Sequence, residues 1–398
     1  NAMIQISPET QLFIREHSSD DVRALALQAK KYPDINMPTA ITQIAGRQVA
    51  AEKIPSWREI EEIWYPKHLS LEQCSSEITA RYKARLLQGD SLTDLTGGFG
   101  IDCSFLATGF KFATYVERQE ELCEIAAHNF PILNLNHINI KNEDGVTYLQ
   151  AMSPVDCLFL DPARRNEHGG KTVAISDCEP NVAELEGLLL SKANRIMIKL
   201  SPMLDLSQAL KELPHTQEVH IISVNNECKE LLLLLGQTAP EEIPVHCVNL
   251  STKGEQEKQL FVFTREQEQH SECSYTDTLG NYLYEPNASL LKAGAFRSIA
   301  AAYSVKKLHP NSHLYTSDTQ IEGFPGRTFR IINRCSLNKK EIKENLSDLK
   351  KANITVRNFP ATVAELRKRI KLAEGGDTYL FASTLNDGQK ILIRCGKV

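Results

Sequence analysis

The chain has 398 residues, of which 42% are hydrophobic and 24% charged, proportions typical of a globular protein with material for two or three domains. No apolar run approaches the roughly 20 residues of a membrane span, and the first residues lack the pattern of a secretory signal. The ten cysteines are scattered and form no C-x-x-C pair, so neither a zinc knuckle nor a redox motif is indicated. We expect a reduced cytoplasmic protein with no membrane segment and no metal.

The charge is unevenly distributed along the chain. Residues 321–398 contain 16 Lys+Arg and 8 Asp+Glu, giving +8, so the preceding 320 residues hold 29 basic and 42 acidic residues, giving −13. A basic C-terminal module on an acidic body indicates a polyanionic partner. The alternative interpretation is a set of solvated helix faces that bind nothing.

Residues 3–88 are predicted to form a helical segment. Ser7-Pro8 is a helix start with proline at the first position, and Pro38 opens an amphipathic run. A third helix is predicted from residue 71 to residue 87, before a glycine. We expect this segment to pack against the domain that follows.

Residues 89–268 alternate between short apolar runs and helical stretches, which predicts a parallel α/β sheet. The predicted strands are 91–94, 113–117, 137–140, 155–160 and 195–199, with helices at 119–129, 144–151, 181–191 and 205–212. A hairpin of 219–224 and 230–235 follows, then strands at 243–250 and 259–264.

The last third of the chain is predicted to be a smaller α+β part. Residues 265–277 are polar and linker-like, and a connecting segment, 275–320, contains a helix-like run over 288–303. Residues 321–398 predict a β-α-β-α-β-β module, with strands at 328–334, 354–358, 377–385 and 389–395 and helices at 338–352 and 362–371.

A glycine-rich turn follows the first predicted strand. The stretch from Leu92 to Asp102 reads as a strand ending in Asp94, a turn Thr96-Gly97-Gly98-Phe99-Gly100, and a helix start. Glycines there allow positive φ and close backbone approach, and a helix N-terminus offers free N–H donors. The turn therefore predicts a nucleotide-type cofactor site.

Two further acids follow strands of the same predicted sheet. Glu117 ends the second strand, 23 residues after Asp94, where an acid can accept both ribose hydroxyl protons. The fourth strand leads into Asp161-Pro162-Ala163-Arg164-Arg165, at the sheet edge where open α/β folds bind ligands. The two arginines could clamp a phosphate or carboxylate. Solvated charges at strand ends are the alternative for both motifs.

Taken in order, these motifs resemble those of a bacterial group of class I S-adenosylmethionine (SAM) methyltransferases. The resemblance extends over Asn142-Glu143-Asp144, over the run from Lys199 to Asp205, and over Phe324-Pro325-Gly326-Arg327, and so covers almost the whole chain. It implies a Rossmann-like methyltransferase domain, a small ferredoxin-like segment and a C-terminal THUMP-like domain. Because THUMP domains are associated with RNA binding, it also implies an RNA substrate.

The resemblance implies a role for each matched position. Asp94, Thr96, Gly97, Gly98 and Gly100 would shape the methionine side of a SAM pocket, with Thr96 where the first glycine often stands. Glu117 would bind the ribose and Asp144 the adenine, although an N-cap role for Asp144 competes. Asp161 and Arg164 are the predicted catalytic residues. The predicted RNA contacts are Arg165, Lys199, Arg327, Arg330, Arg334, Arg367, Lys368 and Arg369. For Lys199, at the end of the fifth strand, a structural pair with a neighbouring acid is the alternative.

One departure leaves the acceptor open. Amino-directed methyltransferases often carry Pro-Pro-aromatic after the acid, whereas Ala163 and Arg164 stand here. A carbon-directed reaction would need a reactive cysteine, for which Cys178 and Cys228 are candidates, with buried structural cysteines as the alternative. The leading hypothesis is methylation of a tRNA or rRNA base. A small-molecule or protein methyltransferase, or an RNA-binding protein with a vestigial SAM pocket, remain alternatives.

Overall fold

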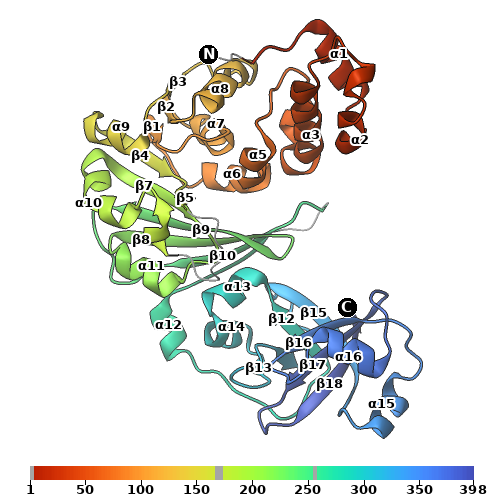
Figure 1. Ribbon diagram of the computed structural model, residues 1–398. Helices are drawn as coiled ribbons and strands as arrows, with labels where there is room; N and C mark the ends of the chain where they lie inside the picture. Colours follow the sequence, from red (N-terminus) through yellow and green to blue (C-terminus); the bar gives the residue numbers. More distant parts are fainter. Residues whose placement is uncertain (1–3, 166–173, 254–257) are drawn as a thin grey trace. The chain divides into compact units, whose positions relative to one another are not determined.

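The computed structural model describes residues 4–165, 174–253 and 258–398, so Met3, the predicted start of the helical segment, lies outside the described residues. The chain forms two compact units (Figure 1). The first runs up to Glu218 and includes Glu230–Pro240; the second comprises Val219–Lys229 and everything from Glu241 onwards. Among the described residues no helix combines the length and apolar character needed to cross a membrane.

The first unit begins with the predicted helices, drawn red to orange in Figure 1. Ser7 caps the first one, as predicted, by accepting from the Thr10 N–H at 3.1 Å. The single helix predicted from 71 to 87 is instead two, because Cys74 and Ser76 are extended. Serines compete with the backbone for hydrogen bonds and favour helix ends. The elements are α1 (Pro8–Glu16), α2 (Val22–Ala26), the 3₁₀ turn η1 (Ala29–Lys31), α3 (Met37–Lys53), α4 (Pro55–Arg58), α5 (His68–Gln73) and α6 (Glu77–Ala84).

The sheet of the first unit confirms the predicted α/β fold. Its strand order is β9-β7-β4-β1-β2-β3, parallel except for β9, which pairs antiparallel with β7. The strands are β1 (Ser91–Asp94), β2 (Phe112–Val116), β3 (Ile138–Lys141), β4 (Val155–Leu160), β7 (Ala193–Leu200) and β9 (Glu227–Gly236). The helices between them are α7 (Ile101–Ala107), α8 (Glu120–Ile132), α9 (Gly145–Ala151), α10 (Val182–Lys192) and α11 (Leu206–Glu212).

The N-terminal helices pack directly on the glycine-rich turn. Phe99, inside the turn, is buried edge-on against Trp57 with ring centroids 5.2 Å apart, and lies 5.9 Å from the Tyr65 ring. Tyr65 in turn fits against Gly46 of α3, where a Cβ added to the glycine would stand 2.3 Å from the tyrosine Cβ. The helical segment therefore shares one core with the turn and fixes its position.

The second unit contains a three-stranded group and a separate seven-stranded sheet. In the first, β8 (Thr216–Val224) pairs parallel with β10 (Val245–Leu250), which pairs antiparallel with β11 (Gln259–Phe263). The seven-stranded order is β13-β14-β12-β15-β18-β17-β16. Its strands are β12 (Tyr282–Pro286), β13 (Lys306–Lys307), β14 (Tyr315–Ser317), β15 (Gly326–Cys335), β16 (Asn353–Arg357), β17 (Thr378–Thr384) and β18 (Lys390–Lys397).

The helices of the second unit differ from prediction in two places. The run over 288–303 is broken into α13 and α14 at Gly294, which adopts φ +72° and ends the first helix. The polar stretch after Thr264 is helical because Thr264 and Gln267 cap its start reciprocally. The helices are α12 (Arg265–His270), α13 (Ala288–Ala293), α14 (Phe296–Tyr303), α15 (Lys339–Leu346) and α16 (Val363–Ile370).

Candidate cofactor and acceptor site

A pocket opens at the carboxyl ends of β1, β2 and β4 in the first unit. Its cavity volume is about 290 Å³. Ten residues predicted from the sequence line this one pocket, together with α5 and the turn after it. These ten are Asp94, Thr96, Gly97, Gly98, Gly100, Glu117, Asp144, Asp161, Arg164 and Arg165.

Thr96 connects the ends of two neighbouring strands. Its hydroxyl donates to Asp94 Oδ1 at 3.3 Å and accepts the backbone N–H of Asp161 at 2.7 Å. The Thr96 N–H also donates to Asp94 Oδ1, at 2.9 Å. A glycine at this position would offer no such link. The threonine therefore fixes Asp94 and Asp161 relative to each other.

The three glycines allow the turn to close over β2. A Cβ on Gly97 would stand 2.3 Å from Tyr115 Cε2, inside the tyrosine ring. Gly98 and Gly100 have φ of +58° and +93°, which side chains disfavour. The turn therefore requires Gly97 for space, and the other two glycines for backbone conformation.

Glu117 is held at the rim of the turn by two backbone donors. Its Oε1 accepts from the Gly98 N–H at 3.0 Å and its Oε2 from the Gln119 N–H at 2.7 Å. An ionised carboxylate has about four acceptor positions, so each oxygen retains capacity for another donor. This geometry suits a group with two neighbouring hydroxyls.

Asp144 takes the competing role recognised in the sequence. Its Oδ2 caps α9 by accepting from the Thr147 N–H at 3.0 Å and from the Thr147 hydroxyl at 3.1 Å. It also lines the pocket. The next residue, Gly145, packs against the backbone of Leu95, since a Cβ on it would lie 2.4 Å from the Leu95 carbonyl oxygen.

A buried ion cluster lies beneath the pocket. Lys83 of α6 is fully buried and lies 2.7 Å from Asp102 Oδ1 and 2.7 Å from Glu230 Oε1. Its ammonium also donates to Ser75 Oγ at 2.7 Å, and Ser75 donates to Asp102 Oδ2 at 2.7 Å. Burial raises the pKa of Asp102, but the charges of Lys83 and Lys199, with the hydrogen bonds from Lys83 and Ser75, together outweigh burial, and the pKa lies below its usual value. The cluster therefore joins the N-terminal helices to α7 and β9 through charge.

Lys199 extends this cluster to the pocket itself. Its Nζ lies 3.3 Å from Asp161 Oδ2, 4.0 Å from Glu230 Oε2 and 3.0 Å from Ser75 Oγ. The Lys199 side chain is 12% exposed. Burial would lower the pKa of Lys199, but the carboxylates of Asp161, Glu230 and Asp102 raise it above its usual value. The structure thus places Lys199 inside the protein rather than on a surface where it could contact RNA.

The segment after Asp161 forms one wall of the pocket. Ala163 and Arg164 form the short strand β5 (Ala163–Arg164), paired with β6 (Cys178–Glu179) after the 3₁₀ turn η2 (Ile175–Asp177). Arg164 and Arg165 are exposed. Burial raises the pKa of the Cys178 thiol, which disfavours the thiolate that a nucleophile needs.

Sequence reasoning missed the contribution of the N-terminal segment. Ser70, Gln73, Cys74 and Ser75 line the pocket from the side of α5. Burial raises the pKa of Cys74 to about 11. These positions carry no motif and lie 19 or more residues before Asp94, so only the fold brings them to the site.

The predicted basic residues of the second unit do not form one patch. Arg327 donates to Glu285 Oε1 through Nε and Nη2, at 2.9 and 2.7 Å, and Arg367 donates to the carbonyls of Leu372 and Ala352. Both guanidinium groups therefore bind within the fold. Arg327 is nevertheless exposed, as are Arg330, Arg334, Lys368 and Arg369. Arg334 and Arg369 also donate within the module, to Gln389 Oε1 and to the Leu337 carbonyl.

A bulge separates two of these exposed arginines. The register of β15 against β18 shifts between Ile331 and Asn333. Before the bulge Phe329 belongs to one core cluster, and after it Cys335 belongs to another. Because the side-chain period of a strand is two, Arg330 and Arg334 leave β15 on opposite faces.

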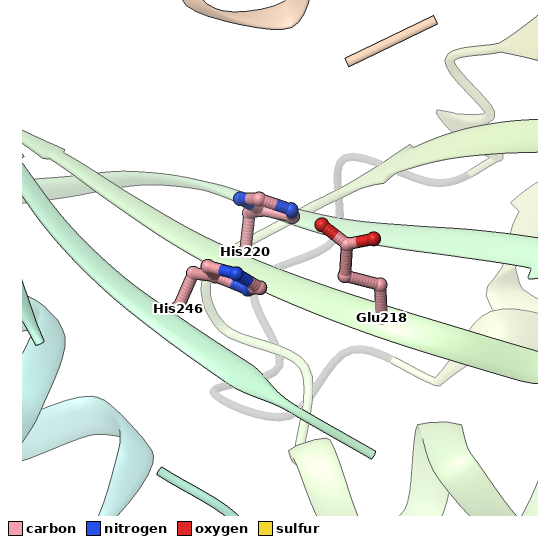
Figure 2. Close-up of side chains that lie close together, drawn as sticks. All are labelled: Glu218, His220 and His246. Carbon is pink, nitrogen blue, oxygen red and sulfur yellow. The ribbon is translucent and has the colours of Figure 1, made fainter. Parts of the chain in front are cut away.

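A second group of polar side chains lies on β8 and β10 (Figure 2). His220 and His246 are directly paired in register, with stacked rings 4.1 Å apart and 6° from parallel. Glu218 is two residues before His220 on β8, and the nearest ligand atoms of the three lie within 4.8 Å of one another. Glu218 also lies 3.6 Å from Arg195 Nη2. No sequence pattern indicates this grouping, because it depends on the register of strands 26 residues apart.

Comparison with known proteins identifies the modules. Residues 282–325 match a family model described as a ferredoxin-like domain, and residues 326–397 match one described as THUMP domain-like. No curated protein sequence matches the chain. Two solved structures are similar over part of the chain at 14% identity. One, from Streptococcus mutans in complex with SAH, covers 41% of this chain and 97% of its own at a TM-score of 0.31. The other, an rRNA methylase from Streptococcus thermophilus, covers 40% and 94% at 0.29.

One solved structure is similar over the full length. It is described as a "putative methyltransferase" from Porphyromonas gingivalis W83, is 34% identical, covers 98% of each chain and has a TM-score of 0.86. The protein therefore belongs to the same family, the bacterial class I SAM-dependent methyltransferases that carry a ferredoxin-like segment and a C-terminal THUMP-like domain.

Proposed function

We propose that this protein transfers a methyl group from SAM to a base of tRNA or rRNA. The observation that carries the proposal is that one pocket gathers the glycine-rich turn and the acids that follow β1, β2 and β4. Family membership supports the reaction class, and the THUMP-like domain supports RNA as the acceptor.

The residues of the pocket suit each part of SAM. Gly97 lets the turn lie against Tyr115, and the Glu117 carboxylate is oriented by Gly98 and Gln119 while retaining acceptor capacity for ribose hydroxyls. Asp144, although it caps α9, lines the same pocket and would face the adenine. Asp94, Thr96 and Gly100 would surround the methionine part. Bound SAM would supply an electrophilic methyl group on a sulfonium.

The protein's own contribution is alignment. Methyl transfer from a sulfonium requires the acceptor atom in line and water excluded, which positioning residues can provide. Asp161, fixed by Thr96, would orient the acceptor and take up a proton from it. Arg164 and Arg165, exposed on the wall formed by the segment after Asp161, would hold the nucleotide by its phosphate or by stacking.

RNA binding would rest on fewer residues than the sequence suggested. Arg330, Arg334, Lys368 and Arg369 are exposed and would contact the phosphate backbone. Arg367, which donates to two backbone carbonyls, would act by stabilising the module. Arg327 would also stabilise it through its pair with Glu285, although its side chain is 42% exposed.

The test is transfer of a labelled methyl group from SAM into total RNA from a strain that lacks the gene. Mass spectrometry of nucleosides from the mutant strain would show the missing modification. Asp161→Ala should abolish transfer while SAM still binds in calorimetry. If the label enters only protein or small molecules, RNA is not the acceptor. If the wild-type protein does not bind SAM, the proposal is refuted.

A further inference from the structure

Asp161 lies between the pocket and the buried ion cluster. Its side chain is 34% exposed and lines the pocket, whereas its partner Lys199 is 12% exposed. The two come from neighbouring parallel strands, with Leu160 of β4 directly paired with Ile198 of β7. Asp161 follows Leu160, and Lys199 follows Ile198. The register of the two strands therefore places the ammonium beside the carboxylate.

Lys199 is also anchored from behind. Its Nζ donates to Ser75 Oγ at 3.0 Å, and Glu230 Oε2 lies 4.0 Å away. Ser75 is in turn held by Lys83 and Asp102. A lysine side chain has four rotatable bonds and is ordinarily flexible. Here the contacts with Ser75 and Glu230 restrain the Lys199 ammonium.

We propose that Lys199 is the positioning residue of Asp161, holding its carboxyl group fixed at the wall of the pocket. This inference rests on the proposed function only in taking the methyl acceptor as the group that Asp161 orients. Thr96 fixes the backbone of Asp161, and Lys199 fixes its side chain. Lys199 does not itself line the pocket, so it would act on a bound molecule only through Asp161.

The surrounding charges show why the ammonium is needed. Burial raises the pKa of Asp161, and Lys199 is the main group that opposes this. Asp102 and Glu230 raise the pKa of Asp161 further, and Lys83 lowers it. Asp94 is a third nearby acid, whose pKa burial places well above its usual value. The thiols that also face this region are those of Cys74 and Cys178.

The test follows the Asp161 carboxyl group directly, without cofactor or RNA. Protein labelled with ¹³C at the aspartate side-chain carboxyls is titrated by NMR, and the Asp161 signal is assigned by its loss in Asp161→Asn. An adjacent cation lowers an aspartate pKa by about 1–3 pH units. The titration midpoint of Asp161 should therefore rise by that amount in Lys199→Met and in Lys199→Gln, and should return towards the wild-type value in Lys199→Arg.

Lys192→Met is the matched control. Lys192 is also partly buried, but its Nζ donates to the backbone carbonyl of Gln150 rather than to a carboxylate. Its removal should leave the Asp161 midpoint unchanged. If Lys199→Met and Lys199→Gln fold, as judged by tryptophan fluorescence, and titrate like the wild type, Lys199 has only a structural role and the proposal is wrong.

Failure of the proposed function gives a different result. A protein that never binds SAM would still show the midpoint shift, since the titration uses no ligand. Where transfer is measurable, the acid limb of its pH profile should move upward in Lys199→Met together with the midpoint. A loss of rate without that movement would contradict the positioning role.

Discussion

Replacing Lys83 by methionine tests whether the buried ion cluster is built around this one ammonium. Lys83 has no solvent exposure and lies 2.7 Å from carboxylate oxygens of both Asp102 and Glu230. Lys83→Met nearly preserves the length of the side chain but removes the ammonium that the two buried acids and the Ser75 hydroxyl share. Ser75 still donates to Asp102, and Lys199 stays 4.0 Å from Glu230, but Asp102 and Glu230 each lose their nearest cation. The variant should be strongly destabilised at neutral pH.

The magnitude follows from the burial. Removing one partner of a buried ion pair costs about 3–5 kcal/mol, and two carboxylates lose their partner here, so we expect about 5 kcal/mol at pH 7. In the wild type the pKa of Asp102 lies below its usual value, so its contribution to stability is present above the unfolded pKa and is lost as pH falls through the folded one. In the variant the unpaired carboxyl titrates above its unfolded pKa. As the pH falls through the range in which this carboxyl takes up its proton in the folded variant, the difference in unfolding free energy between wild type and variant should shrink. The decrease should be up to about 1.4 kcal/mol per pH unit for each carboxyl.

The assay is urea unfolding followed by tryptophan fluorescence at several pH values between 5 and 8. Both tryptophans, Trp57 and Trp64, lie in the first unit, so the signal reports the unit that contains the cluster. Lys192→Met, which loses only hydrogen bonds to backbone carbonyls, should cost about 1 kcal/mol at every pH. A loss below about 2 kcal/mol for Lys83→Met at pH 7, or one that does not depend on pH, would refute this account of the cluster, given the range for buried pairs.

Three further predictions concern the turn and the C-terminal module. Thr96→Val removes the hydroxyl that joins Asp94 to the Asp161 N–H and should cost about 1–3 kcal/mol in urea unfolding, whereas Thr96→Ser should be nearly neutral. Gly97→Ala places a Cβ inside the Tyr115 ring and should weaken SAM binding in calorimetry. Its control, Gly187→Ala in α10, meets nothing within 4 Å and should stabilise by up to about 1 kcal/mol. Lys368→Glu combined with Arg369→Glu should reduce RNA affinity and flatten its salt dependence, while Arg367→Met should lower stability, and the reverse pattern would show that Arg367 contacts RNA.

The parts of the fold that were predictable are those encoded locally. The strands ending at Asp94, Glu117 and Asp161 could be read because a buried parallel strand is a short apolar run, and the Gly97-Gly98 turn and its acids follow at fixed distances. Helix boundaries were less predictable. Gly294 ends α13 within a run of continuous helical character, and the extended residues Cys74 and Ser76 divide the helix predicted after residue 71.

The parts that were missed depend on register and on long-range packing. For Lys199 the sequence leaves open a contact with a phosphate or carboxylate ligand and a structural pair with a neighbouring acid, and only the pairing of β4 with β7 identifies Asp161 as that acid. Arg367 belongs to a basic run, yet its guanidinium group donates to the carbonyl of Leu372, in the loop after α16, and to that of Ala352, just before β16. Ser75 has no neighbouring motif, and its place in the cluster is set by α6 and α7 packing together. No local pattern contains this information.

Calorimetric titration of SAM into the full-length wild type and into Glu117→Ala tests the central claim most directly. Glu117 is held by backbone donors at the rim of the glycine-rich turn, so its truncation removes the proposed ribose contact without removing a buried partner of the ion cluster. We predict that the wild type binds SAM with a dissociation constant below about 1 mM, the upper end of usual substrate constants, and that Glu117→Ala, while folded, loses at least tenfold in affinity. Absence of SAM binding by the folded wild type, or equal affinity in the two proteins, would contradict the assignment of this pocket.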